Sequence, residues 1–325
     1  MEYRLLGRTG VRVSQLCFGT MTFGAEADET MSAQLYHRCR EAGINCFDTA
    51  NGYAQGRSEE ILGRLMANER DELVIATKFA NSTRADDPNA RGGSRRHIMQ
   101  AVEESLRRLG TDRIDLYYIH HPDPHSPLEE TLRALDDLVH QGKVLYPAIS
   151  NHSAWETAKA LGISAREGLA RFEAMQPMYS LLKRKAELEL LPLARHEGLA
   201  VLPYSPGAAG LLTGKYAGGK VPEQSRLTTK PRYQERYGED WIPTAVEGFL
   251  AQARERGVHP VSLAVAWVAA HPAVTAPIVG ARNLEQLEPA LASLSIELDS
   301  AGYETLARLA PHPGSPTDRN EELGE

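Results

Sequence analysis

Residues 114–150 read IDLYYIHHPDPHSPLEETLRALDDLVHQGKVLYPAIS, and this stretch decides the fold class. It begins with a short run of β-branched and aromatic residues at 114–120 and ends with a second β-prone run at 143–150. Between the two runs, apolar residues recur at helical spacing over about 127–141. A strand, an amphipathic helix and another strand in this order predict a βαβ unit with parallel strands.

The same alternation runs along most of the 325 residues. Nearly uninterrupted apolar runs predict strands that are buried on both faces of a parallel sheet. Eight such strands favour closure into a (β/α)8 TIM barrel, with an open doubly wound sheet as the alternative. The predicted strands span 16–19, 44–48, 73–78, 114–120, 143–150, 171–176, 199–204 and 275–280. The predicted helices lie near 29–42, 58–68, 94–109, 127–141, 153–162, 184–197 and 243–270.

The first 19 residues, MEYRLLGRTGVRVSQLCFG, carry two short apolar runs around Gly7-Arg8-Thr9-Gly10. Glycines on both sides suit a tight turn, so this segment predicts an N-terminal β-hairpin that precedes the barrel. Later in the chain, Ser94, Ser126-Pro127 and Ser153 suit N-cap and first-turn positions. These residues are predicted to mark the starts of three helices.

Two polar stretches interrupt the alternation. Residues 81–93 follow the third predicted strand, and a long loop over 215–242 follows the seventh. Long loops in compact domains are usually functional or disordered, and both of these follow the strand ends at which barrel enzymes build active sites. The chain, 1–325, is predicted as one domain with a C-terminal helix and a flexible polar tail over about 311–325.

Composition narrows the class of protein. The 36 basic and 43 acidic residues give a net charge of −7, which argues against a nucleic-acid-binding protein. No apolar run approaches the roughly 20 residues that span a bilayer, and the N-terminus lacks the pattern of a signal peptide. Cys17, Cys39 and Cys46 form no C-x-x-C pair, which predicts a cytoplasmic protein with small, buried, unreactive cysteines.

Several common catalytic signatures are missing. The sequence contains no G-x-G-x-x-G after a strand, no H-E-x-x-H and no G-x-S-x-G. The run GLLTGKY at 210–216 approaches a phosphate loop, but its glycine spacing is one residue short and Tyr replaces Ser or Thr. The histidine-rich run 120–125 raises a metal site as an alternative. No second cluster completes such a site, so no metal is expected.

Ionisable residues stand at the carboxyl ends of neighbouring predicted strands. Asp48 ends the second strand, Lys78 the third and His120 the fourth, and Tyr53 follows Asp48 by five residues. Burying an unpaired charge is costly, so charges at these positions need a partner or a function. Because adjacent strands share one rim of a barrel, we expect these four side chains to meet over one pocket.

Together these residue types form a proton-transfer device. A phenol with a pKa of about 10 is a weak acid at neutral pH, and an ammonium group nearby, here Lys78, lowers that pKa. Asp48 would hold Lys78 charged, and a neutral His120 would donate a hydrogen bond to a carbonyl oxygen on which charge develops. The simpler alternative is a buried Asp48–Lys78 pair that only stabilises adjacent strands, with Tyr53 as a surface aromatic residue.

The chain resembles the aldo-keto reductase family from residue 3 to about residue 309. The motifs occur in the family's order: DTANGY (48–53), GRSEEILG (56–63), ATK (76–78), DLYYIHHPD (115–123), ISN (149–151), YSP (204–206) and IVGAR (278–282). The run GLLTGKY is similar to the branch that includes bacterial reductases and potassium-channel β subunits. The resemblance therefore also implies a barrel.

The resemblance implies NADPH-dependent reduction of a small-molecule aldehyde or ketone to an alcohol. It marks Tyr53 as the proton donor and assigns Lys78 and Asp48 to tuning that donor. The histidine of a His-x-Pro pattern orients the carbonyl, and here the pattern begins at His120 with His121 as the variable residue. The substrate pocket is expected to be lined by Phe23, Asn51 and Trp241, together with the loops 81–93 and 215–242.

The resemblance also implies which residues hold the cofactor. Those expected at the nicotinamide end are Thr20, Met21, Asp48, Ser150, Asn151, Gln176 and Tyr204, with Tyr204 flat under the ring. Those expected at the phosphates are Ser205, Pro206, Gly207, Gly210, Lys215, Arg226, Gly280, Arg282 and Gln286. The family often has Gln-x-x-Glu-Asn at the adenine, whereas residues 286–290 read QLEPA. This loss of polar partners leaves NADH possible beside NADPH.

Two other functions stay open. One is a cofactor-binding regulatory subunit with little turnover, as in the channel subunits; His120 argues against it, since those relatives lack the histidine. The other is a Schiff-base lyase that uses Lys78 as its nucleophile. The physiological substrate and the oligomeric state are left open.

Overall fold

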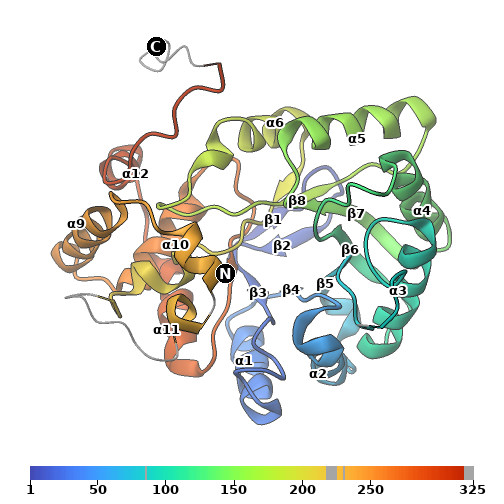
Figure 1. Cartoon of the computed structure of the whole chain (residues 1–325). Helices are drawn as coiled ribbons and strands as arrows, with labels where there is room; N and C mark the ends of the chain where they lie inside the picture. The colour runs from blue at the N-terminus through green and yellow to red at the C-terminus, as the bar shows by residue number, and fades with distance from the viewer. Residues whose placement is uncertain (85, 217–224, 230, 318–325) are drawn as a thin grey trace.

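Eight parallel strands close into a barrel in the computed structural model, which describes residues 1–84, 86–216, 225–229 and 231–317 (Figure 1). The strands are β3 (Cys17–Gly19), β4 (Cys46–Asp48), β5 (Val74–Phe79), β6 (Ile114–Ile119), β7 (Val144–Ser150), β8 (Ala174–Gln176), β9 (Ala200–Val201) and β10 (Ile278–Val279). They pair in the order β10-β3-β4-β5-β6-β7-β8-β9. The ends meet because the Ile278 N–H donates to the Pro203 carbonyl at 2.8 Å, beside a parallel bridge to Tyr204. The predicted barrel is confirmed, and the open sheet is wrong.

Side chains along each strand alternate between the inside of the barrel and its outer face. Small residues such as Ala76 and Ala148 dominate the inside, where they pack with Tyr118. The residues that alternate with them along the strands are large, such as Phe47 and Ile75, and belong to the core between the sheet and the helices. The interior of an eight-stranded barrel is just wide enough for side chains to fill it, which accounts for the small residues there.

Helices surround the barrel (Figure 1). They include α1 (Glu29–Glu41), α2 (Arg57–Met66), α3 (Arg95–Leu109), α4 (Leu128–His140), α5 (Ala154–Glu167), α6 (Leu190–Glu197), α9 (Ile242–Glu255), α10 (Pro260–Ala270), α11 (Leu284–Ala292) and α12 (Ser300–Ala307). The predicted C-terminal helix is confirmed as α12. It is held by Tyr303, whose ring stacks on Trp267 of α10 at 4.9 Å between centroids.

Local sequence explains most helix boundaries. Ser94 and Ser153 are N-caps as predicted, and Ser153 forms a capping box with Glu156. The predicted start at Ser126 is wrong, because its hydroxyl donates to Asp123 at 2.6 Å and leaves Pro127 as an N-cap without a side-chain bond.

The single helix predicted over 243–270 is two helices, α9 and α10. Gly257 adopts a φ of 65°, a conformation that ends α9 at low cost. His259 then caps α10 by accepting from the Val261 N–H at 3.1 Å, and Pro260 takes the first helical position. Because the ring of Pro260 lacks an N–H and cannot continue a preceding helix, the chain changes direction here.

The predicted N-terminal hairpin is confirmed and closes the amino end of the barrel. Strands β1 (Tyr3–Leu5) and β2 (Arg12–Ser14) pair antiparallel. Leu6 and Val13 are fully buried with the inward-facing residues of the barrel. Gly7 has a φ of 57°, and a Cβ there would lie 2.8 Å from the carbonyl oxygens of Glu173 and Gly198. The hairpin therefore fits tightly under the amino ends of the strands.

The predicted loop 215–242 is partly helical. In the part that the structure describes, α7 (Arg226–Thr229) and α8 (Pro231–Arg236) precede α9, while 217–224 and 230 lie outside the described residues. Of the predicted tail, 311–317 carry no helix or strand, and 318–325 lie outside the described residues. Among the residues described, no helix combines the length and the apolar character needed to cross a membrane.

Candidate active site

The carboxyl end of the barrel gathers the predicted catalytic side chains. Asp48 is the last residue of β4, Lys78 lies near the end of β5, and His120 directly follows β6. Each lies two residues after an inward-facing side chain of its strand, namely Cys46, Ala76 and Tyr118 respectively. Because strand side chains alternate, this spacing turns all three into the barrel mouth.

Lys78 and Asp48 form a buried ion pair. The Lys78 Nζ lies 2.5 Å from Asp48 Oδ1 and also donates to the Thr49 carbonyl at 2.7 Å. Asp48 Oδ2 accepts from the amide nitrogen of Gln176 at 2.9 Å. Burial lowers the pKa of Lys78, but the attraction of Asp48 and Tyr53 outweighs it, so the pKa lies above its usual value. Lys78 is therefore protonated at neutral pH.

Tyr53 begins the short 3₁₀ turn η1 (Tyr53–Gly56), in which Ala54 and Gln55 have φ values of 46° and 54°. Its Oη lies 3.5 Å from the Lys78 Nζ, at the outer limit of a hydrogen bond. Burial raises the pKa of Tyr53 above its usual value, and Lys78 lowers it by less. The predicted net decrease of this pKa is wrong, because desolvation of the phenol outweighs the nearby ammonium.

His120 is the histidine that lies beside Tyr53. It is 9% exposed, its ring centroid lies 6.0 Å from that of Tyr53, and its Nδ1 lies 2.9 Å from the amide nitrogen of Asn81. His121 stacks on it at 4.3 Å but is exposed. Burial lowers the pKa of His120 to about 2, assisted by Lys78 and His121. The imidazole is therefore neutral, as predicted.

Backbone strain is concentrated at this end of the barrel. Left-handed φ angles in non-glycine residues cost about 1–3 kcal/mol each and cluster at functional sites. Among the residues described, every such residue lies in a loop that follows a barrel strand at its carboxyl end. They are Ala54, Gln55, Ala80, Asn151, Ser205, Ala208 and Ala209. The distribution marks this rim, independently of residue type, as the working face.

The residues predicted at the nicotinamide lie together around the rim. The hydroxyl of Tyr204 donates to Asn151 Oδ1 at 2.8 Å, and Asn151 Nδ2 donates to the His120 carbonyl at 2.8 Å. Ser150 Oγ donates to the Gln176 carbonyl at 2.9 Å. Buried Thr20 and half-buried Met21 directly follow β3 on the same rim. Polar groups therefore surround the four predicted catalytic side chains at the barrel mouth.

The turn after β9 carries residues that were predicted to lie at the pyrophosphate. Ser205, Pro206 and Gly207 lead into the 3₁₀ segment η4 (Ala208–Thr213). Gly210 has a φ of 96°, and a Cβ there would lie 2.5 Å from the Lys215 Nζ. The positive φ favours glycine here, and the Lys215 side chain lies across the turn. Arg226 begins α7, and its side chain lies outside the described part of the chain.

The predicted adenosine end follows β10. Gln286 Oε1 accepts from the Arg282 N–H at 3.2 Å, which folds the start of α11 around Arg282. Gly280 packs closely, because a Cβ there would lie 3.3 Å from the Gly19 carbonyl. Glu288 faces α1, where Arg38 pairs with it at 2.6 Å. The predicted residues Arg282 and Gln286 therefore lie together at the start of α11, where the Arg282 guanidinium pairs with Glu26 at 3.7 Å.

The residues predicted to line the substrate pocket differ in how far they are buried. Asn51 is buried at the rim and its Oδ1 has no hydrogen-bond partner among the described residues, so a polar group is available there. Trp241 is half-buried and N-caps α9. Phe23 is fully buried, 5.8 Å from the ring of Phe18, so a contact with substrate would require it to become exposed.

Both loops that were predicted to line the pocket contribute side chains that were not singled out from the sequence. Asn81 contacts His120 from the first position of the loop 81–93. On α8, the guanidinium groups of Arg232 and Arg236 lie 5.3 and 5.1 Å from the ring of Tyr233, and both act electrostatically on Tyr204.

The GRSEEILG motif supports the site from outside. Glu59 is fully buried and accepts from the Thr77 hydroxyl at 2.5 Å and from Arg108 at 2.7 Å. Gly63 lets α2 approach α3, since a Cβ there would lie 2.5 Å from the Leu109 carbonyl. Because Thr77 adjoins Lys78, this ion pair braces the strand that carries the lysine.

In the histidine-rich turn 120–125, the acidic residue Asp123 has a structural role. Asp123 accepts hydrogen bonds from the Gly93 N–H at 2.7 Å, the Ser126 hydroxyl at 2.6 Å and the His125 N–H at 3.0 Å. Its carboxylate therefore ties the loop 81–93 to the turn after β6. Within the described part of the chain, no group of three or more acidic, histidine or cysteine side chains could hold a metal ion.

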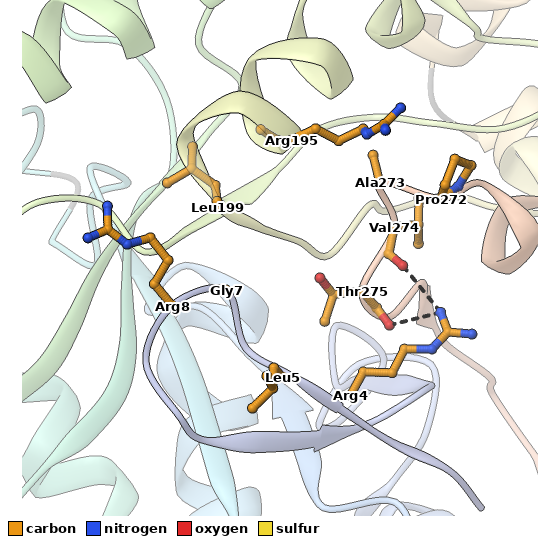
Figure 2. Close-up of a pocket in the computed structure, with 12 residues that line it drawn as sticks. Arg4, Leu5, Gly7, Arg8, Arg195, Leu199, Pro272, Ala273, Val274 and Thr275 are labelled. Atoms are coloured by element: carbon orange, nitrogen blue, oxygen red, sulfur yellow. Dashed lines mark hydrogen bonds between the residues drawn. The ribbon is translucent and has the colours of Figure 1, made fainter.

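A cavity of about 320 Å³ opens at the opposite end of the barrel, between the hairpin and the segments before β9 and β10 (Figure 2). Three arginines line it, but Arg8 and Arg195 point in different directions. Arg4 donates to the carbonyls of Val274 and Thr275 at 3.2 and 3.3 Å. These groups do not converge on one ligand, so the chemistry is assigned to the carboxyl end.

Comparison with known proteins identifies the family. Residues 15–311 match the description "Aldo/keto reductase family". The chain belongs to the aldo/keto reductase family. It is 39% identical over 331 residues to the uncharacterized oxidoreductase YrpG of Bacillus subtilis (strain 168), covering 98% of each chain. It is 39% identical over 303 residues to a probable voltage-gated potassium channel subunit beta of Oryza sativa subsp. japonica, covering 91% of this chain and 92% of the relative.

A third relative is named for a reduction. The chain is 32% identical over 346 residues to versiconal hemiacetal acetate reductase of Aspergillus parasiticus, covering 97% of this chain and 99% of the relative. Family and relatives together identify this aldo/keto reductase as an oxidoreductase. The resemblance seen in the motifs is thereby confirmed.

Proposed function

We propose that this aldo/keto reductase reduces an aldehyde or ketone to an alcohol, with NADPH as cofactor and Tyr53 as proton donor. The observation that carries the proposal is the position of Lys78, whose Nζ is within hydrogen-bonding distance of both Asp48 and Tyr53. A neutral imidazole stands beside this phenol. A phenol, a fixed ammonium and a neutral imidazole on one rim fit proton delivery to a carbonyl oxygen.

Each residue has a distinct part in this mechanism. Bound NADPH supplies the hydride that reduces the carbonyl carbon. His120 donates a hydrogen bond to the carbonyl oxygen and holds it beside Tyr53. As negative charge develops on that oxygen, the Tyr53 hydroxyl gives it a proton, and Lys78 stabilises the phenolate that remains. Asp48, fixed by Gln176, keeps Lys78 charged.

Two alternatives fit the observations less well. A Schiff-base lyase needs a neutral amine, whereas the carboxylate of Asp48 at 2.5 Å raises the pKa of Lys78 and keeps it protonated. A regulatory subunit, suggested by the channel-subunit relative, would need no proton donor, yet Tyr53 and His120 are positioned together over Lys78. Reduction therefore remains the preferred function.

Turnover with a reactive aldehyde tests the proposal. Oxidation of NADPH is followed by its absorbance with 4-nitrobenzaldehyde, and then with a panel of aldehydes and ketones, each repeated with NADH. We expect turnover, with NADPH preferred because Arg282 suits bidentate binding of a 2′-phosphate. Tight NADPH binding without turnover on any carbonyl would overturn the reductase and favour the regulatory subunit.

The pH dependence of both reaction directions follows from the state of Tyr53. Burial raises the pKa of this phenol, so the protonated form needed for reduction is present throughout the neutral range. We expect kcat/KM for reduction to stay flat near neutral pH and to fall only in strongly alkaline solution. Alcohol oxidation needs the phenolate and is expected to rise over the same interval. Reduction that declines between pH 6 and 8, with no change in stability, would contradict this assignment.

We also propose a cytoplasmic location and a small-molecule partner. Cys17, Cys39 and Cys46 are buried and form no disulfide, which suits a reducing compartment. The net charge of −7 supports a partner other than nucleic acid. Fractionation of cells followed by immunodetection of the chain tests the location.

A further inference from the structure

Asn81 is held rigidly against His120. Its Nδ2 lies 2.9 Å from Nδ1 of the imidazole. Ala80 turns the chain toward the histidine with a φ of 85°, and the Asn51 side chain donates to the Asn81 carbonyl at 2.9 Å. Gly52 packs against it, because a Cβ there would lie 3.0 Å from the Asn81 Cβ. The side chain is therefore placed by backbone contacts rather than by the rest of its polar loop.

A neutral imidazole carries one proton, so one ring nitrogen donates and the other accepts. The proton's position decides which role each nitrogen plays, and the hydrogen bond made by one nitrogen sets the state of the other. An amide nitrogen can only donate. A bond from Asn81 Nδ2 therefore makes Nδ1 the acceptor and leaves the proton on Nε2.

We infer that Asn81 is a positioning residue that fixes His120 in the tautomer with its proton on Nε2, ready to donate to a carbonyl oxygen. That the acceptor is a carbonyl oxygen rests on the proposed function, whereas the tautomer of His120 does not. Asn81 thus has the role of an outer partner that orients a working imidazole, comparable to the second partners of ligating histidines. Nothing in the strand pattern points to it, since it lies one residue beyond the turn at Ala80.

An amide is the suitable group at this position. A carboxylate there would accept a hydrogen bond from Nδ1–H and favour the imidazolium. Asparagine does not titrate, and it supplies a donor without adding charge beside Lys78. These differences make Asn81→Asp and Asn81→Ala an informative pair. Both keep the backbone bond from Asn51, because that bond ends on the carbonyl of residue 81.

The tautomer is measured directly by long-range ¹H–¹⁵N NMR of protein with ¹⁵N-labelled histidine, using His120→Gln to assign the signals. In the wild type we expect an Nε2–H, non-protonated Nδ1 pattern for His120 over the neutral range. Asn81→Ala is expected to give a mixture of tautomers and about a tenfold loss of kcat, with unchanged NADPH affinity. A wild-type ring with its proton on Nδ1, or an Asn81→Ala ring with the wild-type pattern, would overturn the inference.

Asn81→Asp separates positioning from mere structural support. The new carboxylate raises the pKa of His120, and the imidazolium that it stabilises at low pH still donates from Nε2. Activity is therefore expected to approach the wild type at low pH and to fall as pH rises through the new pKa, a limb that the wild type lacks. A uniform loss at every pH would contradict the inference.

A double variant gives the last control. In a His120→Gln background, Asn81→Ala is expected to cause no further loss of kcat, because its effect passes through the imidazole. Additive losses would refute this coupling. If the NMR pattern behaves as expected but no carbonyl is reduced by any form, the inference stands and the proposed function fails. If carbonyls are reduced but Asn81→Ala leaves the tautomer of His120 unchanged, the proposed function stands and the inference fails.

Discussion

Tyr53→Phe is expected to lose about 10²–10⁴-fold in kcat for carbonyl reduction, while NADPH binds with nearly unchanged affinity. The substitution removes only the hydroxyl that lies 3.5 Å from the Lys78 Nζ and that is proposed to supply the proton. The ring that packs beside His120 is kept. Steady-state NADPH oxidation measures turnover, and the quenching of protein fluorescence by NADPH measures affinity.

Tyr36→Phe is a matched control for loss of a phenol. The Tyr36 hydroxyl donates to Glu69 at 2.5 Å, on α1 and away from the rim. We expect this variant to keep wild-type kcat. Turnover of Tyr53→Phe within about threefold of the control would eliminate Tyr53 as the proton donor.

Lys78→Met is expected to abolish turnover and to destabilise the protein by about 3–5 kcal/mol, because removing one partner of a buried pair leaves an uncompensated charge. The side chains of Lys78 and Asp48 are 0% and 4% exposed, so water cannot replace the lost ammonium. Among the residues that the structure describes, the amide of Gln176 is then the one side chain that still donates to the carboxylate. The free energy of unfolding is measured by urea titration.

The double variant Asp48→Asn/Lys78→Met tests the reason for this loss. Without either charge, most of the lost stability is expected to return while activity stays absent. A single variant as stable as the double one at pH 7 would show that Asp48 carries no buried charge.

Much of the fold could be predicted because it depends on local patterns. Short β-prone runs alternating with helical periodicity indicate parallel strands with crossover helices, and eight of them indicate closure. The largest error concerned 243–270, where helical periodicity continues across Gly257 and Pro260 although the chain turns between them. Periodicity reports which faces are apolar, whereas these two residues determine where a helix ends.

The candidate site could be predicted where the alternation of side chains along a strand determines which way they point. Asp48, Lys78 and His120 each end or follow a predicted strand, and alternation turns all three inward. The state of the phenol was not predictable. A sequence shows that Lys78 can approach Tyr53, but the pKa depends on how much water the fold removes, and here burial outweighs the ammonium.

The sequence by itself determined the barrel, the order of its strands and the residue types that gather at one rim, because these depend on spacing along the chain. Only the tertiary structure decided which histidine lies beside Tyr53, and that Asn81 contacts it from a different loop. The tertiary structure alone also determined that Gln176 donates a hydrogen bond to Asp48, 128 residues away in the chain. Hydrogen bonds of this kind depend on angles and distances to about an ångström between distant segments, and no local propensity encodes them.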